Sequence, residues 1–296
     1  MLNDSWTQLS SFPGDGRNHP AMVNIGNKIF VGCGSNDASL GLSDWWEYDI
    51  TNDTWTQKSD FPSNGRHHPY FFGIDNYGYV GFGHGSTAGQ GSNPNASVFI
   101  YNDLYRYDPS NDSWQIMSQF PSQGRVAGTQ FSYQGKGYVL SGDGDNHYPL
   151  GTSEFWEYDP ITDSWAQLPS HPGNSIWAPG NFIIGCNVYF LLGANKWTYP
   201  FTYPKNIYKY RLGSDCGCTD PSAVNFSAIA IQDDGSCCYV SGCTDPYSIN
   251  FDSTACYDNG TCIPAVLGCL IYTSDAADEG LGVDLGGRRI IKKKRG

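Results

Sequence analysis

The sequence predicts an all-β protein built from four-stranded units that stack on one another. A motif of the form Phe-Pro-x-x-Gly-Arg begins at Phe12, Phe61 and Phe120, and an altered copy begins at His171. Each copy follows a tryptophan six residues earlier, and the spacings between these tryptophans are 49, 59 and 51 residues. A period near fifty in a chain rich in glycine and aromatic residues indicates stacked sheets, because one such unit cannot bury both of its faces alone. The tryptophans, which we expect in the core between units, are Trp6, Trp55, Trp114 and Trp165.

The second unit shows the expected strands in chain order. Residues 69–74 are an apolar run suited to an inner strand. Residues 78–83 are a glycine-rich strand, which suits a position where backbones approach closely. Residues 103–107 alternate as a half-buried strand does. Residues 108–112 carry turn-forming Asp, Pro, Ser and Asn, and residues 113–117 around the tryptophan form the fourth strand.

The other units repeat this plan. The glycine strand returns at 29–34 and 138–142, and the third strand returns at 45–49, 155–159 and 207–210. Short, regular strands separated by turn signals favour an all-β array.

The first and last units are irregular in complementary ways. No tryptophan strand follows Tyr210, whereas residues 4–9 form a tryptophan strand that precedes the first unit. We therefore expect residues 4–9 to complete the last unit, which would remove an open sheet edge.

Over about residues 3–212 the chain resembles the kelch family of β-propellers, which includes the galactose-oxidase-like propellers. The resemblance is carried by the glycine strand, the Tyr-Asp pair and the tryptophan at this spacing. It implies a kelch-type β-propeller with four blades visible, which we expect to be part of a larger ring. Because Met1 leads directly into the end of a blade turn, we expect residues 1–212 to be a fragment.

Two short cysteine-rich repeats are predicted at 213–264, at about 216–238 and 242–262. Gly-Cys-Thr-Asp-Pro recurs after 25 residues, and so does the Asp-Gly/Asn-Gly turn before the last cysteine. These repeats resemble units of secreted and surface proteins from Bacteroidetes-type bacteria. So small a unit needs cross-links, but seven cysteines leave the connectivity open. The expected pairs are Cys218 with Cys237 and Cys243 with Cys262.

Calcium is the one cofactor to consider, and otherwise we expect none. Asp233, Asp234 and Asp258 offer oxygen ligands, but the twelve-residue loop of an EF-hand is absent, so turn formation is the simpler interpretation.

Residues 265–296 form a separate tail. From residue 269 the sequence resembles a translated sequencing-library adaptor, so we expect an artefactual or disordered segment. Its basic cluster is therefore not interpreted as a nucleic-acid patch.

Composition restricts the partners and the compartment. The formal net charge of −12 opposes binding to nucleic acid and to anionic membranes. No apolar run is long enough to span a bilayer. The crowded cysteines predict an extracellular or cell-surface location, with any signal peptide lost by truncation. The oligomeric state is not predicted.

Binding residues are expected on one face of the ring, where the loops that enter each blade meet the loops that follow each second strand. The repeated Arg17, Arg66 and Arg125 are interpreted as structural, and so are His19 and His68, because they hold equivalent positions. Residues outside the repeat pattern are the ligand candidates: His84, His147, Tyr148, Trp197, Tyr199 and Tyr203.

Function is expected to be the binding of a carbohydrate or a protein partner by this face. The alternative is an enzyme acting on sugars, either galactose-oxidase-like or sialic-acid-mutarotase-like. No catalytic set of residues stands out in the sequence, and Cys33 and Cys186 are not placed as the copper oxidases require.

Overall fold

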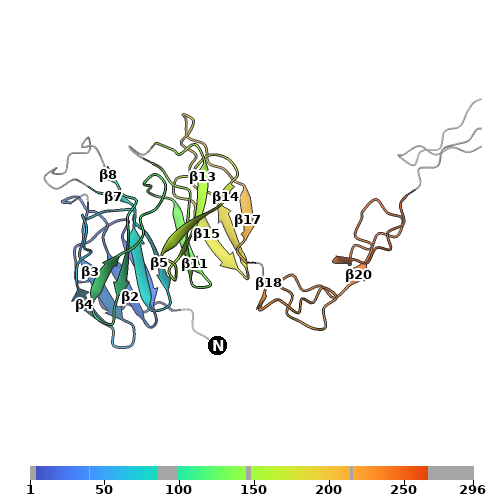
Figure 1. Cartoon of the computed structure of the whole chain (residues 1–296), viewed down its shortest axis with the longest axis horizontal. Helices are drawn as coiled ribbons and strands as arrows, with labels where there is room; N and C mark the ends of the chain where they lie inside the picture. Colours follow the sequence, from blue (N-terminus) through green and yellow to red (C-terminus); the bar gives the residue numbers. More distant parts are fainter. Residues whose placement is uncertain (1–4, 40, 86–98, 145–147, 214–215, 266–296) are drawn as a thin grey trace, which may run out of the picture. The chain divides into compact units, whose positions relative to one another are not determined.

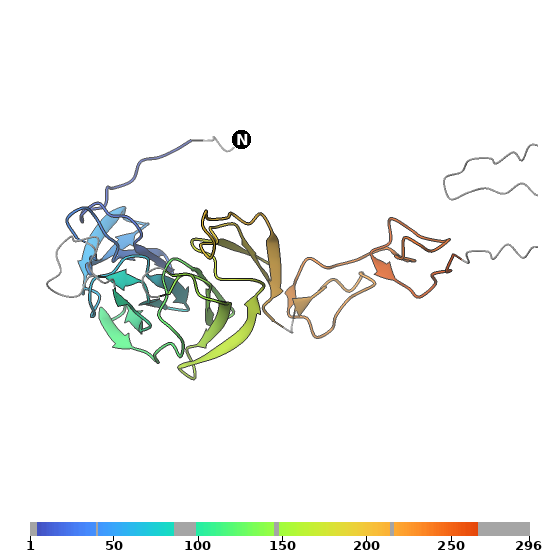
Figure 2. The same ribbon diagram turned by 90° about the horizontal axis from the view of Figure 1, so that it is seen from above.

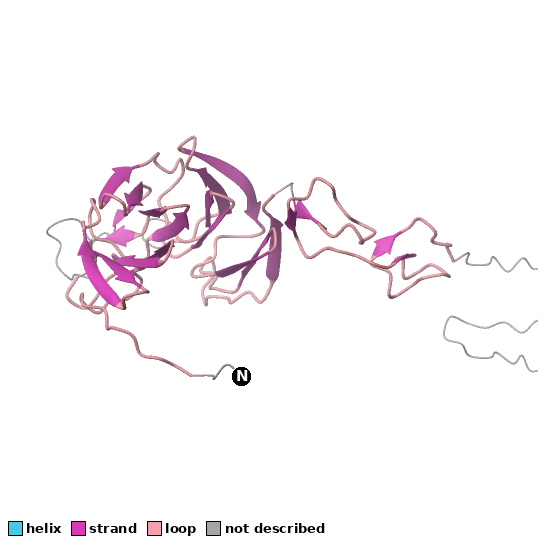
Figure 3. Ribbon diagram, turned by 90° about the horizontal axis from the view of Figure 1, so that it is seen from below, coloured by secondary structure: helices cyan, strands magenta, loops and turns pink. Residues whose placement is uncertain are grey.

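The computed structural model describes residues 5–39, 41–85, 99–144, 148–213 and 216–265. These residues form strands, turns and loops, and none of them is helical (Figure 3). The chain divides into two compact units. The first is Met1–Asp220 with Ser227–Ser236, and the second is Pro221–Phe226 with Cys237–Gly296.

Four antiparallel sheets make up most of the first unit, as the repeats predict (Figure 1). Three blades have four strands and the last has three. Blade 1 comprises β1 (Ala21–Ile25), β2 (Lys28–Gly32), β3 (Trp45–Asp49) and β4 (Thr54–Lys58); blade 2 comprises β5 (Tyr70–Ile74), β6 (Tyr77–Gly81), β9 (Leu104–Asp108) and β10 (Ser113–Ile116); blade 3 comprises β11 (Thr129–Tyr133), β12 (Lys136–Leu140), β13 (Ser153–Asp159) and β14 (Ser164–His171); blade 4 comprises β15 (Gly180–Ile184), β16 (Asn187–Leu191) and β17 (Ile207–Arg211).

The first strand of each blade is its innermost strand. β5 lies between β1 and β11, and β11 also contacts β15, so the inner strands follow one another from blade 1 to blade 4 (Figure 2). Side chains alternate between buried and more exposed along β1 and β5, which places an apolar layer between neighbouring blades. The kelch-type propeller arrangement is therefore confirmed.

Glycines of the second strands lie where backbones crowd together. A Cβ atom on Gly81 would stand 2.1 Å from the carbonyl oxygen of Asp103, and one on Gly137 would stand 2.3 Å from the ring of Phe72 in the neighbouring blade. Both positions therefore exclude any larger side chain.

The repeated arginine fixes the start of blades 1, 2 and 3. Arg66 is fully buried, donates to the carbonyl oxygen of Phe82 at 3.0 Å, and pairs with Asp103 at 2.5 Å. Its guanidinium group also lies over the ring of Phe61 at 4.5 Å. Arg17 repeats all three contacts, with the carbonyl oxygen of Cys33, with Asp44 and with Phe12. Arg125 repeats the ion pair, with Glu154, and the ring contact, with Phe120.

A second repeated contact joins blades 1, 2 and 3 to the linkers before them. In blade 2 the Tyr107 hydroxyl donates to Asp112 at 2.7 Å, and the same carboxylate accepts the Ser59 N–H at 3.0 Å. The Trp114 indole then donates to the Ser59 carbonyl oxygen at 2.9 Å. Blades 1 and 3 repeat this set with Tyr48, Asp53, Ser10, Trp55 and with Tyr158, Asp163, Ser118, Trp165.

Trp114 and Trp165 pack between blades, against Trp45 and Phe82 of the preceding blade. Trp55 instead packs against Tyr48 of its own blade and Phe12 of the linker before it. The prediction for Trp6 is wrong. Trp6 is fully exposed, with a relative accessibility of 103%, and residues 5–9 are not in a strand. Figure 2 shows this blue segment leading away from the sheets. The expected completion of blade 4 by residues 4–9 does not occur in this structure, since β17 is an edge strand.

Blade 4 has a cavity at the position that Trp55, Trp114 and Trp165 occupy in the other three blades. Trp114 packs against Trp45, Phe61 and Tyr107. The residues of blade 4 that correspond to this set, Phe155, His171 and Tyr210, line an apolar cavity of about 250 Å³. Gly217 occupies the sequence position of the missing tryptophan, so the chain supplies no ring to fill the cavity from that position.

Disulfides organise the cysteine-rich part within each unit. In the first unit Cys186, in blade 4, pairs with Cys216, next to the short parallel pair β18 (Cys216–Gly217) and β19 (Gln232–Asp233). The second unit contains β20 (Ser241–Gly242) paired with β21 (Tyr257–Asp258). Its disulfides are Cys238–Cys256 and the expected Cys243–Cys262. Cys218 and Cys237 are each disulfide-bonded too. The odd count of seven is resolved because Cys186 is the eighth member.

Candidate functional site

Backbone bridges bring two kinds of loop together on one face of the ring. In every blade, the segment that enters the blade pairs with the segment that follows its second strand. In blade 2 the pair is His67 with His84, which exchange N–H···O bonds of 2.8 and 3.0 Å. The corresponding pairs are Asn18–Ser35, Val126–Asp143 and Trp177–Ala194.

These bridge positions differ from blade to blade, although the arginine beside them recurs in three blades. A residue required by the blade itself should recur, as Arg17, Arg66 and Arg125 do. The bridge residues instead change from blade to blade on the same backbone. They offer an amide and a hydroxyl in blade 1, two imidazoles in blade 2, a carboxylate in blade 3 and an indole in blade 4. Variation on a constant scaffold is typical of positions that contact ligands.

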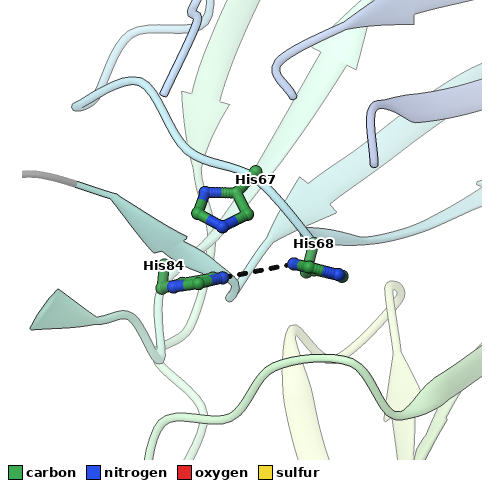
Figure 4. Close-up of side chains that lie close together, drawn as sticks. All are labelled: His67, His68 and His84. Atoms are coloured by element: carbon green, nitrogen blue, oxygen red, sulfur yellow. Dashed lines mark hydrogen bonds between the residues drawn. The ribbon is translucent and has the colours of Figure 1, made fainter. Parts of the chain in front are cut away.

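Blade 2 gathers three imidazoles at this face (Figure 4). His68 Nδ1 lies 3.2 Å from His84 Nε2, and the ring centroids of His67 and His84 are 3.5 Å apart. One ring nitrogen from each of the three histidines lies within 4.8 Å of the others. Among the residues that the structure describes, this is the one group of three or more His, Cys, Asp or Glu side chains close enough to share a metal ion.

A fourth histidine borders the group. The ring of His19 stacks on His68 with centroids 3.6 Å apart, and the His68 N–H donates to the His19 carbonyl oxygen. His19 and His68 both have positive φ angles, as Ala127 and Ala178 do at the same position in blades 3 and 4. All four blades therefore share this backbone conformation, whereas only blades 1 and 2 have a histidine at this position.

An aromatic hairpin rises from blade 4 on the same kind of loop. Asn195 and Thr202 pair through two backbone hydrogen bonds, and Asn195 Oδ1 accepts the Trp197 N–H. The rings beyond this base are exposed to solvent: Trp197 by 53%, Tyr199 by 93%, Phe201 by 43% and Tyr203 by 70%. The candidate residues Trp197, Tyr199 and Tyr203 therefore share one ordered loop.

A buried ion pair ties the base of this hairpin to blade 3. Lys196 Nζ lies 2.5 Å from Asp143 Oδ2, and Lys196 also lies over the Trp177 ring at 5.0 Å. The Asp143 side chain is 1% exposed. Because loss of Lys196 would remove this counter-charge from an almost fully buried carboxylate, the pair holds the start of the hairpin in position.

The remaining candidates lie apart from these two features or outside the described residues. Tyr148 is 71% exposed in the corresponding loop of blade 3, and His147 lies outside the described residues. The calcium candidates form local turns: Asp233, Asp234 and Asp258 accept backbone N–H groups from Gly235, Ser236 and Gly260.

Neither propeller cysteine offers a reactive thiol. Burial raises the pKa of the Cys33 thiol to about 12, and its side chain is fully buried. Cys186 is bonded to Cys216 and is not available for a cross-link to tyrosine.

The repeat pattern did not identify His67 as a site residue, and it favoured a structural role for His19 and His68. The structure places His67 and His68 beside the predicted candidate His84. A signal was present in the sequence, because His67 and His84 both depart from the residues at the equivalent positions of the other three blades.

The comparisons with known proteins agree with the fold. A stretch of 96 residues, 31% of this chain, is 29% identical to an F-box/kelch-repeat protein of Arabidopsis thaliana. The match spans 24% of that relative's length. The solved structure of YjhT covers 70% of this chain and 72% of its own, with a TM-score of 0.57 at 17% identity, a likeness of fold alone. No family model matches the chain.

Within the described residues, no helix is long and apolar enough to cross a membrane.

Proposed function

We propose that the chain is a carbohydrate-binding protein whose loop face contacts the sugar through the aromatic hairpin of blade 4. The observation that carries this proposal is the exposure of four aromatic rings on one loop with an ordered base. Apolar rings exposed together are costly in water and mark interaction surfaces. A flat ring suits the C–H face of a sugar, and nearby hydroxyl and amide groups give orientation.

The scaffold supports binding because little of it has to be ordered when the ligand arrives. The hairpin base is fixed by backbone pairing and by the buried Lys196–Asp143 pair. A preorganised loop avoids part of the entropic cost of association.

Location outside the cell is part of the same proposal. Its support is the series of disulfides, Cys186–Cys216, Cys238–Cys256 and Cys243–Cys262, which persist in oxidising compartments. A protein partner at the same loop is the second candidate ligand, because tyrosine and tryptophan are also enriched in protein interfaces.

The test is a glycan array with the wild-type chain and three variants that each remove one exposed aromatic ring. Tyr199→Ala removes a ring from the hairpin, and Tyr247→Ala removes one from the second unit, where Tyr247 is 85% exposed. We expect glycan signals that Tyr199→Ala and Trp197→Ala reduce at least tenfold and that Tyr247→Ala leaves unchanged. Equal signals from all four proteins, or no glycan bound by the wild type, would reject carbohydrate binding at this loop.

A further inference from the structure

We propose that His67, His68 and His84 form a binding site for a divalent transition-metal ion of the Zn²⁺ and Cu²⁺ class. The site is separate from the aromatic hairpin and does not depend on carbohydrate binding. Neutral imidazole nitrogen is a preferred ligand of these ions, whereas Mg²⁺ and Ca²⁺ prefer oxygen.

The spacing of the nitrogens fits one ion. With Zn–N distances of about 2.0–2.1 Å and tetrahedral angles, two nitrogens on one zinc ion lie roughly 3.3 Å apart. His68 Nδ1 and His84 Nε2 already stand 3.2 Å apart, and the third nitrogen lies within 4.8 Å of both. Figure 4 shows His67 beside the other two rings. The proposal requires the His67 side chain to rotate so that its nitrogen approaches the ion.

The backbone holds the three ligands in place. His67 and His84 are joined by two backbone hydrogen bonds, and His68 is tied to His19 of blade 1 by a third. His84 is 4% exposed, which shields its ring from competing water. A site on paired segments retains its geometry better than one on a free loop.

The scaffold does not require these imidazoles. Blade 1 makes the same bridge with Asn18 and Ser35, and blade 3 makes it with Val126 and Asp143. No other blade places three nitrogen ligands here among its described residues, so the cluster is a property of blade 2 alone.

The charge of the chain also suits a cation. The formal net charge of the chain is −12, which raises the concentration of cations near the surface. The nearest buried cation in sequence, Arg66, is offset by its bidentate partner Asp103. Three protein nitrogens leave a fourth tetrahedral position for water or for an external ligand.

The experiment is a calorimetric titration of the full chain with Zn²⁺, in buffer free of chelators and reductants. Blade 1 provides matched variants: His67→Asn and His84→Ser install the residues that the same bridge carries at Asn18 and Ser35. His171→Phe removes a histidine distant in sequence from the cluster and serves as the control. We expect one Zn²⁺ per chain, with affinity reduced at least 30-fold in either cluster variant and unchanged in the control.

Three results would overturn the proposal: no saturable Zn²⁺ binding, binding that survives both cluster variants, or a loss of binding in His171→Phe equal to that in His84→Ser. Circular dichroism and the thermal midpoint of each metal-free variant establish that it is folded. If His84→Ser fails to fold, His67→Asn decides the question by itself, because its side chain is partly exposed. As a further readout, Zn²⁺ should raise the thermal midpoint of the wild type and not that of His67→Asn.

Discussion

At the scale of single residues, the blades are held together by polar contacts that recur at equivalent positions. Asp53, Asp112 and Asp163 each accept a tyrosine hydroxyl and a backbone N–H from the preceding linker. Burial raises the pKa of Asp112, but the hydrogen bonds from Ser59 and Tyr107 lower it by more. The pKa of Asp112 therefore lies below its ordinary value. The carboxylate is therefore more stable in the folded chain than in the unfolded one.

Replacing this carboxylate should destabilise the chain. Asp112→Ala removes the partner of the buried Tyr107 hydroxyl and places alanine at a φ of 53°, so we expect a loss of about 2–4 kcal/mol in the free energy of unfolding. Asp112→Asn keeps an oxygen acceptor and tolerates this φ, so it should lose only about 1 kcal/mol.

Urea unfolding at pH 7 measures both changes. The pKa of Asp112 is lower in the folded chain than in the unfolded chain. The Asp112 carboxylate therefore stabilises the folded chain fully above the ordinary carboxyl pKa, and this stabilisation is lost as the pH falls from there through the folded pKa. The gap between wild type and Asp112→Ala should therefore narrow below about pH 4. A loss under 0.5 kcal/mol at pH 7 for Asp112→Ala would contradict this role.

At the scale of elements, three blades share one design and blade 4 departs from it. His171 stands where the other linkers have Phe12, Phe61 and Phe120. Its ring packs against Phe190 and Tyr208 at 4.4 and 4.5 Å, and neither ring nitrogen has a hydrogen-bond partner among the described residues. Burial lowers the pKa of His171 to about 4.

This histidine should make the chain less stable in mild acid. Since the folded pKa is below the unfolded value of about 6.5, the unfolded chain takes up a proton first, and stability falls as the pH drops from about 6.5 towards 4. His171→Phe should raise the thermal midpoint at pH 8 and raise it further at pH 5. A midpoint difference that is equal at both pH values would show that His171 does not titrate in this way.

The repeat pattern was sufficient to predict the blades, because strand period, turn residues and spacing are local in sequence. It predicted the strand pairs around Tyr79, Tyr107 and Trp114 closely. The repeat pattern failed for Trp6. The residues around a tryptophan indicate a strand, but they do not indicate which sheet edge that strand will pair with. The same limit applies to the disulfide of Cys216, whose partner Cys186 lies in blade 4, outside the cysteine-rich segment.

The candidate site was only partly predictable for a related reason. Equivalence in sequence led to the assignment of His19 and His68 as structural, yet equivalence fixes the backbone and not the chemistry of the side chain. The bridge between His67 and His84 joins segments from two different loops, and only the folded chain shows that their rings meet.

At the scale of the whole molecule, recurring positions stabilise the propeller and varying positions provide its chemistry. Arg66 with Asp103 belongs to the recurring set, and His67 with His84 belongs to the varying set, although the two sets are adjacent in sequence. This separation explains how one scaffold can carry both a histidine cluster and an aromatic hairpin without losing its blades.

The most direct test of this separation is urea unfolding of Arg66→Ala and His84→Ser, compared with wild type in metal-free buffer. We predict a loss of about 3–5 kcal/mol for Arg66→Ala, because Asp103 would be left without its buried partner. For His84→Ser we predict a change of no more than about 1 kcal/mol, because blade 1 makes the same bridge with serine. A large loss for His84→Ser together with a small one for Arg66→Ala would contradict the division into stabilising and variable positions.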